Sequence, residues 1–217
     1  VFFTYALIIA ALLILPFFFF DLLDGVHRWI SVGPINLYIA SIVLPLLMIH
    51  IWKLALNKRE RDVTALTVIT SGILLFQPDA GQLTAFVCVI AFIVWKMIDN
   101  RMIKAIVIAF TAAACVISWI FLDDLAPVPY VEHILFLVAG LGNFWFILGV
   151  FSLMLLLLPF FFMAGKAPFR LGVYYLMMMI VPFIGQFPMP VMGYGISPII
   201  GYLISITWLH QNKELSL

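Results

Sequence analysis

An acidic residue inside a long apolar stretch is the first candidate for chemistry in this chain. Asp79 follows Gln77 and Pro78 within residues 71–96, which are predominantly apolar. A carboxylate at the centre of a membrane costs about 2.5–3.5 kcal/mol, so such acids are usually structural pivots or functional groups. Pro78 and Gly81 interrupt the helix, and interrupted helices at membrane depth line cavities. We expect Gln77 and Asp79 to bind a cation or a ligand head group, or else to form an interfacial turn.

Two adjacent carboxylates, Asp123 and Asp124, are the candidate catalytic residues. A pair of acids can do acid–base work when the surroundings separate their two pKa values. The alternative is a solvated cap at the end of a helix. Glu132 and His133 lack the HExxH spacing of a zinc site, and no spacing typical of a metal, haem or quinone site is present. We therefore expect no metal and no cofactor.

Arg28 lies in a short polar segment before Trp29. Its guanidinium could bind a phosphate with two parallel hydrogen bonds, and Trp29 could anchor the segment at the membrane surface. The alternative is a short loop in which Arg28 pairs with Asp24. We retain Arg28 as a candidate ligand-binding residue.

Residues 188–198 hold the densest run of glycine and proline in the chain. Ser197 is expected to cap the last helix, with Pro198 at its first position. The free amides at such a helix start form a natural site for anions. Tyr194, Gly195 and Ser197 are therefore candidate ligand-binding residues, and the alternative is an ordered hairpin between two helices.

The composition indicates which elements must position these residues. The chain is 66% hydrophobic and 10% charged, whereas soluble domains carry about 25% charged residues. It therefore predicts one all-α domain over 1–217, a polytopic membrane helix bundle with a broken helix near Pro78 and a divided helix near Gly142. A span needs about 20 apolar residues. Eight spans are expected, near 2–23, 34–56, 63–77, 81–97, 103–122, 133–163, 171–187 and 196–210.

The basic residues predict the orientation of this bundle. In the eight-span arrangement ten of the eleven Lys and Arg fall on one side, and only Arg28 lies on the other. The positive-inside rule makes the basic side cytoplasmic, with both termini there. The acids, Arg28 and the 188–198 run then share the outer face. No basic run suggests nucleic acid as a partner, and no nucleotide-binding motif is present.

Three segments resemble motifs of the SEDS family, the RodA/FtsW-like peptidoglycan glycosyltransferases. Residues 25–33, GVHRWISVG, are similar to the family's G-x-x-RWI-x-x-G loop. Residues 74–81, LLFQPDAG, are similar to its LLxQPDxG motif, and residues 188–197, PMPVMGYGIS, align with its P-L-P-F-x-SYGGS motif. A weaker match is the apolar run 134–142, which ends in Leu-Gly. The resemblance spans most of the chain, with the motifs in the family's order.

The resemblance implies a multi-pass protein of the bacterial inner membrane. The family acts in cell shape and division, polymerising lipid-linked peptidoglycan precursors beside a membrane protein partner. Arg28, Asp79, Tyr194, Gly195 and Ser197 match its motif positions.

The chain also departs from the family. Its members have about ten spans and a long outer loop with a catalytic aspartate, whereas the corresponding segment here is only about 123–132. We therefore expect a shortened protein that binds a polyprenyl-linked glycan, or that acts as a non-catalytic partner. Two alternatives stay open: an accessory structural subunit of a larger membrane complex, and a small-solute or ion transporter that uses Asp79.

Overall fold

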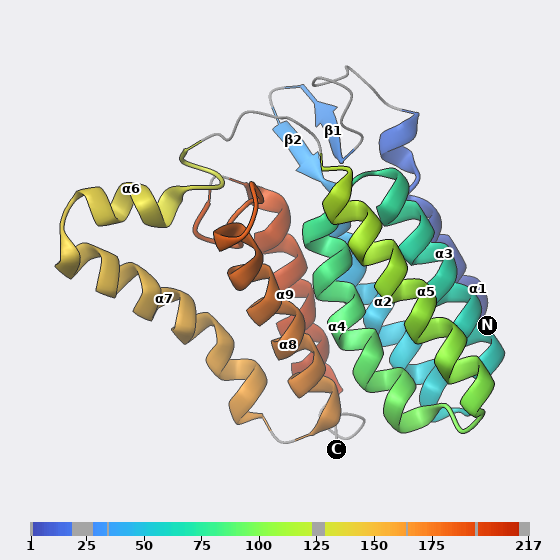
Figure 1. Cartoon of the computed structure of the whole chain (residues 1–217). Helices are drawn as coiled ribbons and strands as arrows, with labels where there is room; N and C mark the ends of the chain where they lie inside the picture. Colours follow the sequence, from blue (N-terminus) through green and yellow to red (C-terminus); the bar gives the residue numbers. More distant parts are fainter. Residues whose placement is uncertain are drawn as a thin grey trace.

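The described part of the chain is helical apart from one small antiparallel hairpin (Figure 1). A computed structural model describes residues 2–18, 28–33, 35–122, 129–163, 165–193 and 195–212. The hairpin pairs β1 (Trp29–Val32) with β2 (Ile35–Tyr38). The α-helices are α1 (Phe2–Leu12), α2 (Ile39–Leu56), α3 (Glu60–Phe76), α4 (Ala80–Met97), α5 (Arg101–Ile120), α6 (Ile134–Gly140), α7 (Asn143–Phe162), α8 (Lys166–Ile180) and α9 (Ile196–Gln211). Two short 3₁₀ helices are η1 (Leu15–Phe17) and η2 (Val181–Phe183).

Four helices within the described residues are long and apolar enough to cross a membrane: α2, α4, α5 and α7. The chain is therefore a membrane protein. Each of the eight expected spans overlaps one of the helices α1–α5 and α7–α9. Helices α1, α3, α8 and α9 are shorter, with 11, 17, 15 and 16 residues. The total of eight spans stays a prediction.

Both expected interruptions are present. Helix α3 ends at Phe76 and α4 begins at Ala80, so the chain turns back at residues 77–79. Helices α6 and α7 are separated at Gly142, whose φ of 119° is a conformation that suits glycine.

The start of the second expected span is corrected by the structure. Residues 35–38 form strand β2, and the helix begins only at Ile39. A short run of mostly apolar residues fits a strand as well as a helix, and Gly33 (φ 61°) provides the turn that reverses the chain. The first span is also shorter than expected. Helix α1 ends at Leu12, and Pro16, which has no N–H to donate, lies in the 3₁₀ turn that follows.

Helix α2 lies at the centre of the bundle. It packs against α1, α3, α4, α8 and α9. Of its residues, 67% are buried inside the protein. The closest approach is to α9, where a Cβ added to Gly201 would overlap the Ser41 carbonyl oxygen. In α5 and in α7, only 22% of an 18-residue apolar stretch is buried inside the protein. The large exposed apolar side chains of these two helices therefore provide the surface that meets lipid.

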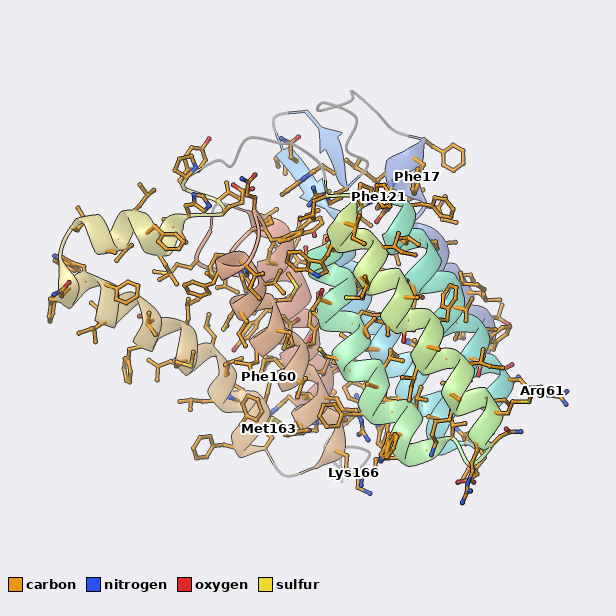
Figure 2. The ribbon with its side chains drawn as sticks, viewed as in Figure 1. Phe17, Arg61, Phe121, Phe160, Met163 and Lys166 are labelled. Carbon is orange, nitrogen blue, oxygen red and sulfur yellow. The ribbon has the colours of Figure 1, made fainter. Side chains whose placement is uncertain are left out.

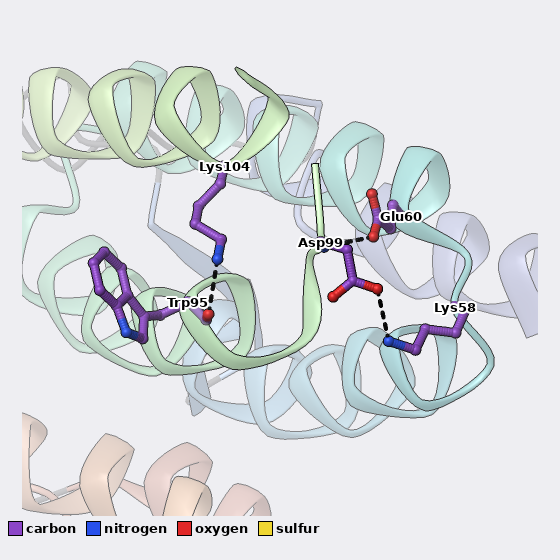
Figure 3. Close-up of polar contacts among 5 residues, drawn as sticks. All are labelled: Lys58, Glu60, Trp95, Asp99 and Lys104. Atoms are coloured by element: carbon purple, nitrogen blue, oxygen red, sulfur yellow. Dashed lines mark hydrogen bonds and ion pairs between the residues drawn. The ribbon is translucent and has the colours of Figure 1, made fainter. Parts of the chain in front are cut away.

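The helix connections at one end of the bundle carry most of the charge, and we call it the basic end. Lys58 Nζ lies 2.9 Å from Asp99 Oδ2, and the Asp99 amide donates to Glu60 Oε1 at 2.7 Å. These contacts join the α2–α3 and α4–α5 connections, and Lys104 Nζ donates to the Trp95 carbonyl beside them (Figure 3).

The opposite end carries β1, β2 and the 77–79 turn, and we call it the hairpin end (Figure 1). The α7–α8 connection lies at the basic end, as do Arg61 and Lys166, whereas Phe17 and Phe121 lie at the hairpin end (Figure 2). The gathering of basic residues at one end fits the expected pattern. Which end faces the cytoplasm stays a prediction.

Candidate functional site

A buried carboxylate lies at the hairpin end, where strand β2 meets the α3–α4 turn. The Tyr38 hydroxyl donates to Asp79 Oδ2 at 2.6 Å, and the Gln82 amide donates to Asp79 Oδ1 at 3.1 Å. Asp79 is fully buried and Tyr38 is 1% exposed. Asp79 is the N-cap of α4, a position that favours aspartate because its oxygen satisfies a free amide of the first turn. Both carboxylate oxygens therefore have hydrogen-bond partners.

Burial and a nearby cation act on this carboxylate in opposite directions. Burial raises the pKa of Asp79, while the charge of Arg28, the hydrogen bond from Tyr38 and the Gln82 amide lower it. The balance leaves the pKa of Asp79 above its ordinary value. Arg28 is itself 5% exposed, and its guanidinium carbon lies 5.7 Å from the centroid of the Phe187 ring. The site therefore places a buried acid and a buried base within electrostatic reach of each other.

Two glutamines extend this polar network away from Asp79. Gln77 Nε2 donates to the Leu13 carbonyl at 2.5 Å, and the Tyr174 hydroxyl donates to Gln82 Oε1 at 2.6 Å. The first bond connects the residue after α1 to the turn that carries Asp79, and the second connects α8 to the first turn of α4. Gln77 Oε1 and Gln82 Nε2 are buried and have no hydrogen-bond partner within the described residues. The network therefore keeps one free acceptor and one free donor on the two sides of Asp79.

Tyr38 connects the carboxylate to the last helix. Its backbone amide donates to Ser197 Oγ at 2.8 Å, and its carbonyl accepts from Ser41 Oγ at 2.8 Å. The Trp29 ring stacks on the Tyr38 ring, with centroids 4.9 Å apart. The expected capping role of Ser197 is wrong, because α9 begins at Ile196 with Gly195 at its N-cap, two residues before the expected start. The Ser197 hydroxyl instead accepts a hydrogen bond from the Tyr38 amide, where β2 joins α2.

Phe187 closes the network on the side of α4. A Cβ added to Gly81 would lie 2.6 Å from Phe187 Cδ1, so the ring packs directly on the backbone of the α4 start. The same ring meets Trp119 edge to face at 5.6 Å and carries Arg28 on its face. Glycine at position 81 is thus required for close approach, and Phe187 separates the polar network from the surface near α5.

The structure brings together four of the sequence-predicted residues. Arg28, Gln77, Asp79 and Ser197 all lie at the hairpin end and are all buried. Gly195 is the N-cap of α9 beside them. The candidate catalytic residues Asp123 and Asp124, and also Tyr194, lie outside the described residues.

Four residues of the network were not predicted: Tyr38, Gln82, Tyr174 and Phe187. One signal could have identified Gln82, because aspartate followed three residues later by glutamine has the spacing of a capping box. The three aromatic residues lie in apolar runs and carry no such signal.

The arrangement is suited to holding segments in place. A general acid or base must lie within hydrogen-bond reach of the reacting group, and Asp79 is enclosed with both oxygens occupied. Its bonds instead join β2 and the α3–α4 turn, and through Tyr38 they reach α9. Within the described residues no three His, Cys, Asp or Glu side chains are grouped to hold a metal ion.

Comparisons with family models and with curated proteins find no match to this chain.

Proposed function

We propose that this chain is a shortened, divergent SEDS-like protein of the bacterial inner membrane that binds a polyprenyl-diphosphate-linked glycan without polymerising it. One observation carries the proposal. Residues from all three motif-like segments, Arg28, Asp79 and Ser197, meet around Tyr38 at the hairpin end. Segments so far apart in sequence have no local reason to converge, so their meeting supports a shared scaffold role.

The charge distribution supports a phosphate-bearing ligand at this end. Arg28 is the one Lys or Arg that the described residues place at the hairpin end, since the others lie at or near the basic end. Arginine binds phosphate with paired, charge-assisted hydrogen bonds. A diphosphate head group that approaches the hairpin would therefore meet the positive charge of Arg28, which also acts on Asp79.

The enclosure of Asp79 supports the non-catalytic part of the proposal. Both Asp79 oxygens accept hydrogen bonds from the protein, and the segment where the family carries its catalytic loop is short in this chain. The protein would present the lipid-linked glycan to a membrane protein partner that performs the reaction.

Reconstituted protein tests both the binding of the lipid-linked glycan and the lack of polymerisation. The chain in nanodiscs should bind a polyprenyl-diphosphate-linked disaccharide, and Arg28→Gln should weaken binding about tenfold or more, as expected for loss of a charged hydrogen bond. The matched control is Arg101→Gln at the basic end, which should bind normally. Formation of glycan polymer by the wild-type chain, abolished in Asp124→Ala, would show that the protein is a polymerase and would contradict the non-catalytic role.

A transporter that uses Asp79 is a second candidate, favoured by the free polar atoms beside it. Gln77 Oε1 and Gln82 Nε2 could accept and donate to a small solute or a hydrated ion passing the carboxylate. Proteoliposomes that take up a cation with wild-type protein, and not with Asp79→Asn, would favour this candidate. Unchanged flux in a folded Asp79→Asn variant would remove it.

A further inference from the structure

Two exposed lysines lie at the basic end, where α4 packs against α8. Lys96 is in the last turn of α4, and Lys166 is the first residue of α8. Helix α4 runs from the 77–79 turn toward the basic end, whereas α8 starts at the basic end and runs away from it, so the two helices are antiparallel (Figure 1). We call the meeting line of the two helices at this end the α4–α8 seam, defined by Phe92, Lys96, Lys166 and Phe169.

A contact between two rings fixes how the helices line up along this seam. Phe92 of α4 meets Phe169 of α8 edge to face, with centroids 5.9 Å apart. Residues three or four apart share one face of a helix. Lys96 follows Phe92 by four residues and Lys166 precedes Phe169 by three. Because the helices are antiparallel, both steps lead about one turn toward the basic end, so the two lysines flank the seam beyond the ring contact.

On the hairpin side of these lysines the seam presents aromatic rings to the lipid. Phe92 is 44% exposed and Phe169 is 45% exposed. Phe161 of α7, which is 42% exposed, meets Phe169 edge to face at 6.0 Å. Three helices thus contribute to one partly exposed apolar surface that begins about one turn from the two positive charges.

Two charges beside an apolar surface at the end of a membrane helix pair match the chemistry of an anionic phospholipid. Basic residues at the ends of membrane helices bind the head groups of such lipids. A lysine stem can lie along apolar surface while its ammonium group stays at the water boundary. Asp99, three residues after Lys96, binds Lys58 in the α2–α3 connection at 2.9 Å.

We propose that the α4–α8 seam binds one anionic phospholipid. Its phosphate lies between the ammonium groups of Lys96 and Lys166, and an acyl chain lies against the exposed rings of Phe92, Phe161 and Phe169. Lys166 projects from the basic end, where a head group would lie (Figure 2). The seam is at the opposite end of the bundle from Arg28 and Asp79, so this lipid is distinct from any ligand of the hairpin end.

Native mass spectrometry of the full chain in detergent tests the proposal by measuring the phospholipid that the protein retains. The wild type should hold one phosphatidylglycerol more tightly than any further one, and phosphatidylcholine with the same acyl chains should bind more weakly. Lys96→Gln and Lys166→Gln should each weaken the affinity for phosphatidylglycerol about fivefold, and the double variant should weaken it about thirtyfold. Unchanged affinity in the double variant would overturn the proposal. If the double variant does not fold, unchanged affinity in either single variant would overturn it.

The matched control is the double variant Arg61→Gln/Arg101→Gln, which also removes two exposed charges from the basic end. These arginines belong to α3 and α5, which lie on the other side of α4 from α8 (Figure 1). The control should bind phosphatidylglycerol as the wild type does. An equal loss in both double variants would show that only the net charge of this end matters, and the seam would not be the site.

Two further measurements decide the source of the phosphate and the end of the bundle. Glycerol phosphate, which carries a phosphate and no acyl chain, should not displace the lipid at millimolar concentration. If it does, the aromatic rings contribute nothing and the lipid is not the ligand. Arg28→Gln should retain phosphatidylglycerol as the wild type does, because Arg28 lies at the hairpin end. A loss in Arg28→Gln as large as in the Lys96→Gln/Lys166→Gln variant would contradict a site at the seam.

Discussion

The backbone amide of Tyr38 donates to the side chain of Ser197 across 159 residues of sequence, while the Tyr38 hydroxyl donates to Asp79. One residue at the junction of strand β2 and helix α2 thus connects the hairpin to the α3–α4 turn and to the start of α9. Its neighbours determine how firmly the hairpin end is held together.

Removing the Tyr38 hydroxyl should destabilise the protein. In Tyr38→Phe the buried Asp79 Oδ2 loses its partner, and an unsatisfied buried acceptor costs about 1–3 kcal/mol. Unfolding by SDS in mixed micelles would measure the loss. Tyr5→Phe is the control, because Tyr5 is 56% exposed on α1 and should unfold as the wild type does. Equal stability of the two variants would contradict the hydrogen bond.

The stability should depend on pH through Asp79, which lies in the turn outside the helices. Its pKa in the folded protein is raised, chiefly by burial, so the folded state holds the proton more tightly than the unfolded state. This contribution is fully present below the unfolded pKa of about 3.9 and is lost as pH rises through the folded pKa.

Melting temperatures measured between pH 4 and pH 8 would reveal the contribution of Asp79 to stability as a difference between wild type and Asp79→Asn. The wild type should lose stability relative to Asp79→Asn as pH rises above 4. A difference that stays flat, or that changes in the opposite direction, would show that the folded pKa is not raised.

Adding one methyl group at Gly201 should separate α9 from α2. A Cβ there overlaps the Ser41 carbonyl oxygen, and backbone cannot move aside as a flexible side chain can. We expect Gly201→Ala to cost about 1–3 kcal/mol. Gly72→Ala is the matched control, since a Cβ at Gly72 meets nothing within 4 Å and alanine favours the helix by up to about 1 kcal/mol. Equal losses in both variants would argue against the close approach.

The ion pair at the basic end should contribute little. Lys58 and Asp99 have side chains 65% and 77% exposed, and exposed pairs contribute about 0–1 kcal/mol. Asp99→Asn should therefore change the unfolding free energy by less than about 1 kcal/mol, because the Asp99 amide keeps its bond to Glu60. A loss as large as that of Tyr38→Phe would mean that this connection, rather than the hairpin end, limits stability.

The helices could be predicted from the sequence because their apolar runs are long. The turn at Gln77-Pro78-Asp79 and the division at Gly142 were also predictable, since Pro and Gly interrupt helices by backbone geometry. The hairpin was not, because residues 28–33 were expected to form a short loop, and the apolar run from Ile35 fits a strand and a membrane helix alike.

The candidate site was predicted in part. Arg28, Gln77, Asp79 and Ser197 stood out because polar residues are rare in this chain, and the structure places all four at one end. Tyr38 and Tyr174 were missed because their rings suit an apolar run, and only the folded arrangement shows which polar atom each hydroxyl reaches.

The bond between Tyr38 and Ser197 has a consequence for biosynthesis. At about 5–20 residues per second, a ribosome needs roughly 8–30 s to add the 159 residues that separate them. Throughout that interval the Tyr38 amide has no Ser197 to bind, and the start of α9 cannot yet pack beside the hairpin. The hairpin end is therefore completed only once the start of α9 has been made, and nascent chains that stall before residue 197 should expose an incomplete end to the cell's membrane proteases.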